Sequence, residues 1–341
     1  MFGLDAYDAS TGELLWRSYN EATLYASPVV ENNVVYTTKG AVSAITGKQI
    51  WTINGYKCCA VEDGYYYTNY NDPSDDTCHF AALDVNTGKI LWQKKLNGQA
   101  SSPAIADGKL FITDLYSPSV LALDAYTGDT IWESETTVEV YLPPVVWGDF
   151  VYVSGLGESF LYGTRSVYCI EASSGRTVWN QTVEGFPTAP AVAYGCVYVG
   201  TGEGYMYAFD ALTGAKKWVC GVVCSDGGIE FSPVVASGAI FFGASDGHLY
   251  ALNATSGVEL WRYEIGRLGS LYASLAIANG CIYIGSCSSK LMALGFSSEE
   301  GVSSVAGSPV DVPSKAELAG LFLSAGTILI GLGSFGSSKT G

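Results

Sequence analysis

The stretch ALDVNTGKILW, residues 82–92, decides the fold because its pattern recurs along the chain. An acceptor side chain is followed by two residues, Thr or Ser, Gly, three residues and Trp. Seven segments share this pattern, namely Asp8–Trp16, Ser43–Trp51, Asp84–Trp92, Asp124–Trp132, Glu171–Trp179, Asp210–Trp218 and Asn253–Trp261. Successive tryptophans lie 35–47 residues apart, a period typical of four-stranded propeller blades.

A second element recurs between these motifs and consists of a small residue or Pro, apolar residues, a turn and a strand with an aromatic residue. Its seven copies are SPVVENNVVY from Ser27, CCAVEDGYYY from Cys58, SPAIADGKLF from Ser102, PPVVWGDFVY from Pro143, APAVAYGCVY from Ala189, SPVVASGAIF from Ser232 and SLAIANGCIY from Ser274. β-Branched and aromatic residues bounded by Gly, Asn and Asp predict short antiparallel strands. Each repeat therefore supplies two hairpins, which predicts an all-β, seven-bladed propeller of four-stranded antiparallel blades.

The residue types of the first motif have local roles. Its acceptor side chain is expected to bond backbone amides two or three residues on, and its Gly takes a positive φ. The Trp then lies on the outer strand, where its indole is expected to be buried against the neighbouring blade.

The ends of the chain raise the question of how the ring closes. The chain begins inside an outer hairpin, and its last inner pair ends in LMALGF, residues 291–296, without the Gly and Trp of the motif. We expect the strand Leu14–Trp16 to pair with the sheet formed by residues 274–296. An eighth blade is predicted only if the natural chain extends beyond Met1.

The pattern A-x-D-x-x-T-G-x-x-x-W, seen from Ala82 and Ala208, resembles the pyrroloquinoline-quinone-like (PQQ-like) propeller repeat over residues 4–296. That family includes quinoprotein alcohol dehydrogenases, a lipoprotein of the outer-membrane barrel-assembly machinery, a lumenal sensor domain and propellers attached to adenylating enzymes. Only the dehydrogenases bind the quinone and calcium. The repeat stabilises blades and does not by itself imply a cofactor, so we expect a non-catalytic, extracytoplasmic binding or scaffolding module. The alternative is a PQQ-dependent dehydrogenase that oxidises an alcohol or sugar, with PQQ and calcium as cofactors.

The adjacent cysteines Cys58 and Cys59 begin an innermost strand in the repeat register and are expected to face the central channel. The quinoprotein dehydrogenases resemble this chain in carrying such a pair, joined as a disulfide beside the quinone. The other interpretation is two small apolar residues in a buried strand. No full set of calcium ligands, catalytic base and quinone platform is assigned, and the motif carboxylates already have a turn role. No catalytic residue is therefore predicted.

A ring of side chains is predicted at one mouth of the channel. Two residues before each inner strand, the repeat places Tyr25, Tyr56, Ala100, Tyr141, Pro187, Glu230 and Tyr272. Tyrosines combine apolar faces with polar tips, so we expect a protein or small-molecule ligand to bind Tyr25, Tyr56, Tyr141, Glu230 and Tyr272. The alternative is ordinary loop aromatics in a chain with 23 tyrosines.

Charge excludes one class of partner. The chain has 33 acidic and 17 basic residues, a net charge of −16, and no basic run, which argues against nucleic acid. The two histidines, His79 and His248, offer little material for catalysis, and no metal site is predicted. The acidic stretch in residues 71–76 is interpreted as a solvated loop rather than a calcium loop. The insertion from Gly155 is the predicted protein contact.

The tail differs from the repeats. Residues 1–296 are assigned to the propeller, and residues 297–341 to a Ser/Gly/Pro-rich linker with a hydrophobic segment. Leu318–Phe335 runs 18 residues without a charge, at the lower limit for a helix that spans a bilayer. We expect membrane attachment here, through a spanning helix or a glycolipid-anchor signal. The alternatives are a Gly-rich strand or a poorly ordered end. The start has no signal-peptide pattern, so a cytosolic location stays open beside the expected periplasmic, secretory-lumen or cell-surface one.

Overall fold

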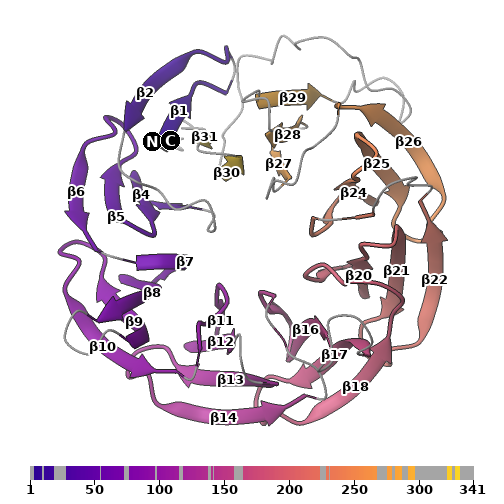
Figure 1. Cartoon of the computed structure of the whole chain (residues 1–341), viewed down its shortest axis with the longest axis horizontal. Coiled ribbons are helices and arrows are strands. Elements are labelled where there is room, and N and C mark those ends of the chain that lie inside the picture. The colour runs from indigo at the N-terminus through magenta and orange to yellow at the C-terminus, as the bar shows by residue number, and fades with distance from the viewer. Residues whose placement is uncertain are drawn as a thin grey trace, which may run out of the picture.

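The computed structural model describes residues 4–9, 11–18, 28–53, 55–72, 77–96, 98–114, 118–136, 140, 142–156, 164–222, 228–229, 231–266, 275–278, 281–285, 291–295, 321–324 and 327–330. Within these ranges every regular element is a β-strand. The strands are arranged as a ring of sheets seen along its axis in Figure 1.

Seven sheets follow one another around the ring in chain order, and the strands within each run outward from the centre. The first three are β3 (Val29–Glu31), β4 (Val34–Thr37), β5 (Gly40–Ser43) and β6 (Gln49–Thr52); β7 (Gly55–Glu62), β8 (Tyr65–Asp72), β9 (Thr77–Asp84) and β10 (Ile90–Lys95); and β11 (Ala104–Ala106), β12 (Lys109–Thr113), β13 (Ser119–Asp124) and β14 (Thr130–Glu135). The next three are β15 (Val145–Trp147), β16 (Phe150–Leu156), β17 (Arg165–Glu171) and β18 (Thr177–Thr182); β19 (Ala191–Ala193), β20 (Cys196–Gly200), β21 (Tyr205–Asp210) and β22 (Lys216–Gly221); and β23 (Val234–Ala236), β24 (Ala239–Gly243), β25 (His248–Asn253) and β26 (Glu259–Glu264). The last, with three strands among the described residues, is β27 (Ala276–Ala278), β28 (Cys281–Gly285) and β29 (Leu291–Gly295).

These sheets confirm the predicted all-β, seven-bladed antiparallel propeller. Each pair of successive strands in a blade is antiparallel, as in the pairing of Ala104 with Phe111 and of Phe111 with Ala122. The core lies between blades rather than in one central layer. Tyr198 of β20 and Phe242 of β24, for example, belong to one buried cluster shared by neighbouring blades.

The Asp-x-x-Thr-Gly turn has the predicted local structure. The carboxylate of Asp84 accepts hydrogen bonds from the backbone amides of Asn86 at 3.1 Å and Thr87 at 2.8 Å. Gly88 has a φ of 68°, in the left-handed region that favours glycine. The turn therefore forms from residues within a single motif.

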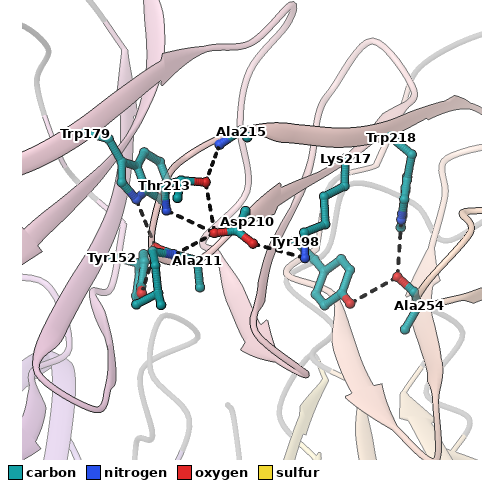
Figure 2. A network of polar contacts seen from close by, with 11 residues as sticks. Tyr152, Trp179, Tyr198, Asp210, Ala211, Thr213, Ala215, Lys217, Trp218 and Ala254 are labelled. Atoms are coloured by element: carbon teal, nitrogen blue, oxygen red, sulfur yellow. Dashed lines mark hydrogen bonds and ion pairs between the residues drawn. The ribbon is translucent and has the colours of Figure 1, made fainter.

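Among the described residues, the tryptophans of six of the seven motifs cross to the next blade. Figure 2 shows this contact twice, with Trp179 directed at the carbonyl of Ala211 and Trp218 at the carbonyl of Ala254. The hydroxyls of Tyr152 and Tyr198 donate to the same two carbonyl oxygens, each at 3.1 Å. The indole thus joins adjacent blades through a hydrogen bond as well as through apolar contact.

The two ends of the chain meet in the ring. Strand β1 (Leu4–Tyr7) pairs with β2 (Leu14–Ser18), and β30 (Leu321–Ser324) pairs with β31 (Thr327–Ile330). β31 lies alongside β1, and β30 lies beside β28. The two hairpins therefore occupy the position between the last and the first of the seven blades (Figure 1).

This arrangement corrects the expected closure. Leu14–Trp16 pairs with β1, and no pairing with the sheet of residues 274–296 occurs among the described strands. The reason is that each end of the chain brings its own hairpin, so the ring closes where β1 and β31 meet. The sequence linked an eighth blade to a longer N-terminus. In the structure, the place between the last and the first of the seven blades is filled by β1 and β2 together with the C-terminal strands β30 and β31.

The hydrophobic segment Leu318–Phe335 contains strands β30 and β31, which is the strand alternative left open by the sequence. In the part of the chain that the structure describes, no helix has the length and apolar character needed to cross a bilayer. Membrane attachment through this segment stays a prediction, as does the domain boundary at residue 296.

Candidate functional site

The predicted site residues fall largely outside what the structure describes. For Tyr56, Cys58 and Cys59 the backbone in β7 is described and the side chains are not. The remaining members of the predicted site lie outside the described residues, namely Tyr25, Tyr141, Glu230 and Tyr272. Their joint role in ligand binding therefore stays a prediction.

The backbone around the cysteine pair departs from regular pairing. Tyr56 faces Asn69 and Ala60 faces Tyr67, so the three residues 57–59 on β7 face the single residue Thr68 on β8. Irregular pairing of this kind bends a strand and re-aims its side chains, and it is common beside functional sites. Cys58 and Cys59 thus lie in the irregular part of an innermost strand.

Two ring positions are described directly and lie where the repeat predicts. Ala100 forms an isolated β-bridge with Asp114, and Pro187 forms one with Thr201, in each case at the end of the second strand of the same blade. Both residues are buried. The repeat register that defined the ring therefore holds at these two positions, although neither side chain is available to a ligand.

Buried polar side chains hold the segments that lead into the inner strands. The side-chain amide of Asn69 donates to the carbonyl of Ala100 at 2.7 Å and accepts from its backbone N–H at 3.2 Å. In the next blades, Thr113 donates to Leu142 at 3.3 Å and Ser154 to Thr188 at 2.7 Å. Each bond links one blade to the next near the axis, which makes the inner rim a rigid frame.

Acidic side chains gather on the inner hairpin turns of the first three blades. Burial raises the pKa of the Glu62 carboxyl, and the negative charges of Asp63, Asp107 and Glu31 raise it further. These four side chains come from the β3–β4, β7–β8 and β11–β12 hairpins. The hydroxyl of Tyr126 donates to Asp63 across a blade joint at 3.1 Å. The arrangement favours cationic groups at this face of the ring.

A cavity of about 350 Å³ adjoins this acidic face between the β11–β14 and β15–β18 blades. Phe111, Val146 and Phe150 provide apolar lining, and Asp107, Lys109 and Asp149 provide charged groups. Nothing among the described residues forms a group of three or more His, Cys, Asp or Glu side chains suited to holding a metal ion. The cavity therefore has the character of a cleft for a mixed apolar and charged group.

The histidines have structural partners that the sequence did not assign. His79 is buried and its Nε2 lies 2.9 Å from the Thr77 hydroxyl. Asp246 Oδ2 accepts the Tyr250 hydroxyl at 2.6 Å and lies 3.4 Å from His248 Nδ1. The sequence could have indicated that His248 and Tyr250 are neighbours, because side chains alternate along a strand and residues 248 and 250 therefore lie on one face of β25.

A ring of antiparallel blades, with an acceptor side chain in each motif turn and indoles that join neighbouring blades, defines the PQQ-like class of β-propellers. The chain belongs to the family of the outer membrane protein assembly factor BamB, whose family model matches residues 3–61, 76–161 and 119–311. This match confirms the family resemblance of the repeat.

Individual relatives differ in their named activities. The chain is 26% identical over 256 residues to the tetrathionate hydrolase of Acidithiobacillus ferrooxidans, covering 63% of this chain and 48% of that protein. It is 29% identical over 152 residues to BamB of Nitrosomonas eutropha, covering 42% of this chain and 35% of that protein. The chain thus spans half or less of the length of these two relatives.

The fold has a counterpart among solved structures. The crystal structure of BamB from Moraxella catarrhalis superimposes with a TM-score of 0.67, covering 87% of this chain and 89% of that chain at 19% sequence identity. At that identity the likeness concerns the fold alone.

Proposed function

We propose that this chain is a non-catalytic propeller that binds or scaffolds a partner outside the cytoplasm. One observation carries this proposal: the recurring carboxylates of the repeat are held as acceptors in their own turns. The pKa of Asp210 is lowered to about 2 by the backbone amide of Thr213 first and by Lys217 second. A carboxylate held in this way is a weak base at neutral pH.

The relatives support the same direction. The family description and the BamB relatives name an outer membrane protein assembly factor. A rigid ring with short turns on one face suits that role, because its surface is ordered before the partner arrives. We therefore propose a periplasmic, secretory-lumen or cell-surface location, with membrane attachment through Leu318–Phe335 kept as part of the proposal.

The partner is proposed to be a protein or a small molecule at the mouth of the ring. The acidic turn residues Glu31, Glu62, Asp63 and Asp107 favour a partner with cationic groups. The predicted set of Tyr25, Tyr56, Tyr141, Glu230 and Tyr272, with Cys58 and Cys59, is retained as the proposed contact region at the other end of the inner strands.

The dehydrogenase alternative depends on whether these residues suit quinone and calcium. Calcium prefers several carboxylate or carbonyl oxygens together. In the described part of the chain, no group of three or more His, Cys, Asp or Glu side chains is placed to hold a metal ion. We therefore derive no reaction step through the quinone.

The experiment that separates the two functions is direct loading. The purified chain is incubated with pyrroloquinoline quinone and calcium, then tested for bound-quinone absorbance and alcohol-dependent reduction of a dye. We expect neither signal, while a quinoprotein alcohol dehydrogenase treated in parallel gives both. A bound quinone together with alcohol-dependent turnover would contradict the non-catalytic function.

A further inference from the structure

Six joints of the ring are closed by one repeated contact. In each, an indole stacks on the motif Gly of the next blade, where an added Cβ would lie 2.5–2.7 Å from the nearest indole carbon. In each, the indole Nε1–H also donates to a backbone carbonyl of that turn, at 2.7–3.2 Å. The pairs are Trp16 with Gly47, Trp51 with Gly88, Trp92 with Gly128, Trp132 with Gly175, Trp179 with Gly214, and Trp218 with Gly257.

The corresponding position in the N-terminal hairpin is open. Gly12 has the same backbone conformation, with a φ of 74°, but no described atom lies within 4 Å of an added Cβ. Gly12 is exposed, whereas the six glycines that carry an indole are buried or half-buried. Ala9, which corresponds to the buried Ala44 of the next blade, is only half-buried. We call the surface formed by Ala9 and Gly12 the open indole slot.

The turn around the open indole slot is otherwise complete. The carboxylate of Asp8 accepts from the backbone amide of Thr11 at 2.9 Å, and Gly12 N–H donates to the carbonyl of Asp8 at 2.7 Å. The contacts correspond to those of Asp84 with Thr87 and Gly88 in a filled joint. The slot is thus preformed, and an indole would not need to reorganise it.

The chain has no tryptophan of its own to place there. By the order of the ring, the indole would come from the outer strand of the blade that contains β27–β29. Trp261 is the last of the eight tryptophans, and seven of the eight belong to motifs. The eighth, Trp147, lies at the β15–β16 hairpin of another blade. The given sequence therefore contains no motif tryptophan for this position.

We propose that the open indole slot binds the tryptophan side chain of an extended segment of a partner protein. The chemistry of the occupant is defined by the six filled slots, which all take an indole from an extended strand. An indole stacked on Gly12 would also donate its N–H to the carbonyl of Ala9. A side chain needs both a flat ring and a hydrogen-bond donor to make these two contacts, and tryptophan has both. This inference rests on the proposed function as a binding module and names the recognition element of its partner.

The test uses the full chain and a short peptide with the sequence of an outer strand. Acetyl-TVWNQTV-amide, residues 177–183, has no charged side chain, so the acidic surface does not attract it. Its tryptophan is replaced by 5-fluorotryptophan, and binding is followed from the ¹⁹F signal of the peptide alone. We expect saturable binding with a shifted ¹⁹F resonance. The peptide TVANQTV, used as a competitor, should bind at least about tenfold more weakly.

Two protein variants locate the binding. Gly12→Ala places a methyl group where the indole would stack, so it should reduce peptide affinity at least about tenfold. Gly238→Ala is the matched control, because Gly238 has a φ of 76° and equally open surroundings but lies in a different hairpin. It should leave peptide affinity unchanged.

Each other outcome overturns the proposal. Absence of binding means that another part of this chain covers the slot. Equal binding of the Trp and Ala peptides, or equal loss in both protein variants, means that the indole is not recognised at Gly12. A second copy of the chain is the occupant if the protein self-associates, and if both the Trp147→Ala substitution and added peptide prevent that association. None of these results bears on quinone loading, so failure here is distinguishable from failure of the proposed function.

Discussion

The indole Nε1–H of Trp92 donates to the carbonyl oxygen of Ala125 at 3.0 Å, across the joint between two blades. The same carbonyl accepts the buried hydroxyl of Tyr67 at 3.2 Å. Both lone pairs of one backbone oxygen are therefore used by the preceding blade. The carbonyl oxygens of Ala211 and Ala254 accept the same two kinds of hydrogen bond. Neighbouring blades are therefore joined by hydrogen bonds within an otherwise apolar interface.

Gly128→Ala tests the stacking part of this joint. An added Cβ would lie 2.5 Å from a ring carbon of Trp92, and Gly128 has a φ of 77°. We expect a loss of about 2–4 kcal/mol in the free energy of unfolding, from left-handed strain together with overpacking. Gly238→Ala has the strain without the clash and should lose about 1–2 kcal/mol. Urea denaturation measures both, and equal losses would exclude a role for the indole contact.

Asn69→Ala tests the frame near the axis. The Asn69 side chain is buried and makes two hydrogen bonds to the backbone of Ala100. Its removal leaves a buried N–H and C=O without these partners, so we expect a loss of about 2–3 kcal/mol in the free energy of unfolding. Asn86→Ala, in an exposed turn, is the control and should change stability by less than about 0.5 kcal/mol. A small effect at Asn69 would mean that water replaces the amide.

The pKa of Asp210 makes stability depend on acid pH. Because the folded pKa is lowered to about 2, the ionised form is favoured by folding, and its contribution is present above the unfolded pKa. That contribution should be lost as the pH falls from about 4 to about 2. The melting temperature of the Asp210→Asn variant should depend less on pH between about pH 4 and pH 2 than that of the wild type. A profile that matches the wild-type one would show that the turn does not depend on the charge.

Glu62 should have the opposite dependence. Its folded pKa is raised by burial and by Asp63, Asp107 and Glu31, so the ionised form opposes folding. The protein should gain from protonation at low pH and lose that gain as the pH rises through the raised pKa. Glu62→Gln should therefore raise the melting temperature at pH 7 and have little effect near pH 4. A variant that melts lower at pH 7 would contradict the crowding of these carboxylates.

Removal of residues 318–341 tests the closure by two chain ends. The truncation deletes β30 and β31 and leaves β1 without the strand that lies alongside it. We expect the melting temperature to fall by about 5–10 °C. Removal of residues 331–341 alone should change it little. If the longer truncation releases the protein from membranes and leaves its melting temperature intact, the segment is an anchor rather than a closing hairpin.

Much of the propeller could be predicted because its signals are local. In each motif, acceptor, Gly and Trp lie within nine residues, as in Asp84–Trp92, and the turn they form depends on few other parts of the chain. The candidate site was harder to predict. The irregular pairing of residues 57–59 with Thr68 leaves no pattern in the sequence, because it arises from how two strands settle against each other.

The sequence by itself determined the class of fold, the number of repeated motifs and the residues that lock neighbouring blades, since turn chemistry and indole burial follow from spacing. It also determined that no tryptophan follows Trp261. Only the tertiary structure decided that β31 lies beside β1 and that Gly12 is exposed. Which strands meet where the ring closes depends on the rotation from each blade to the next, added over all the blades. No short segment of the chain determines that total rotation.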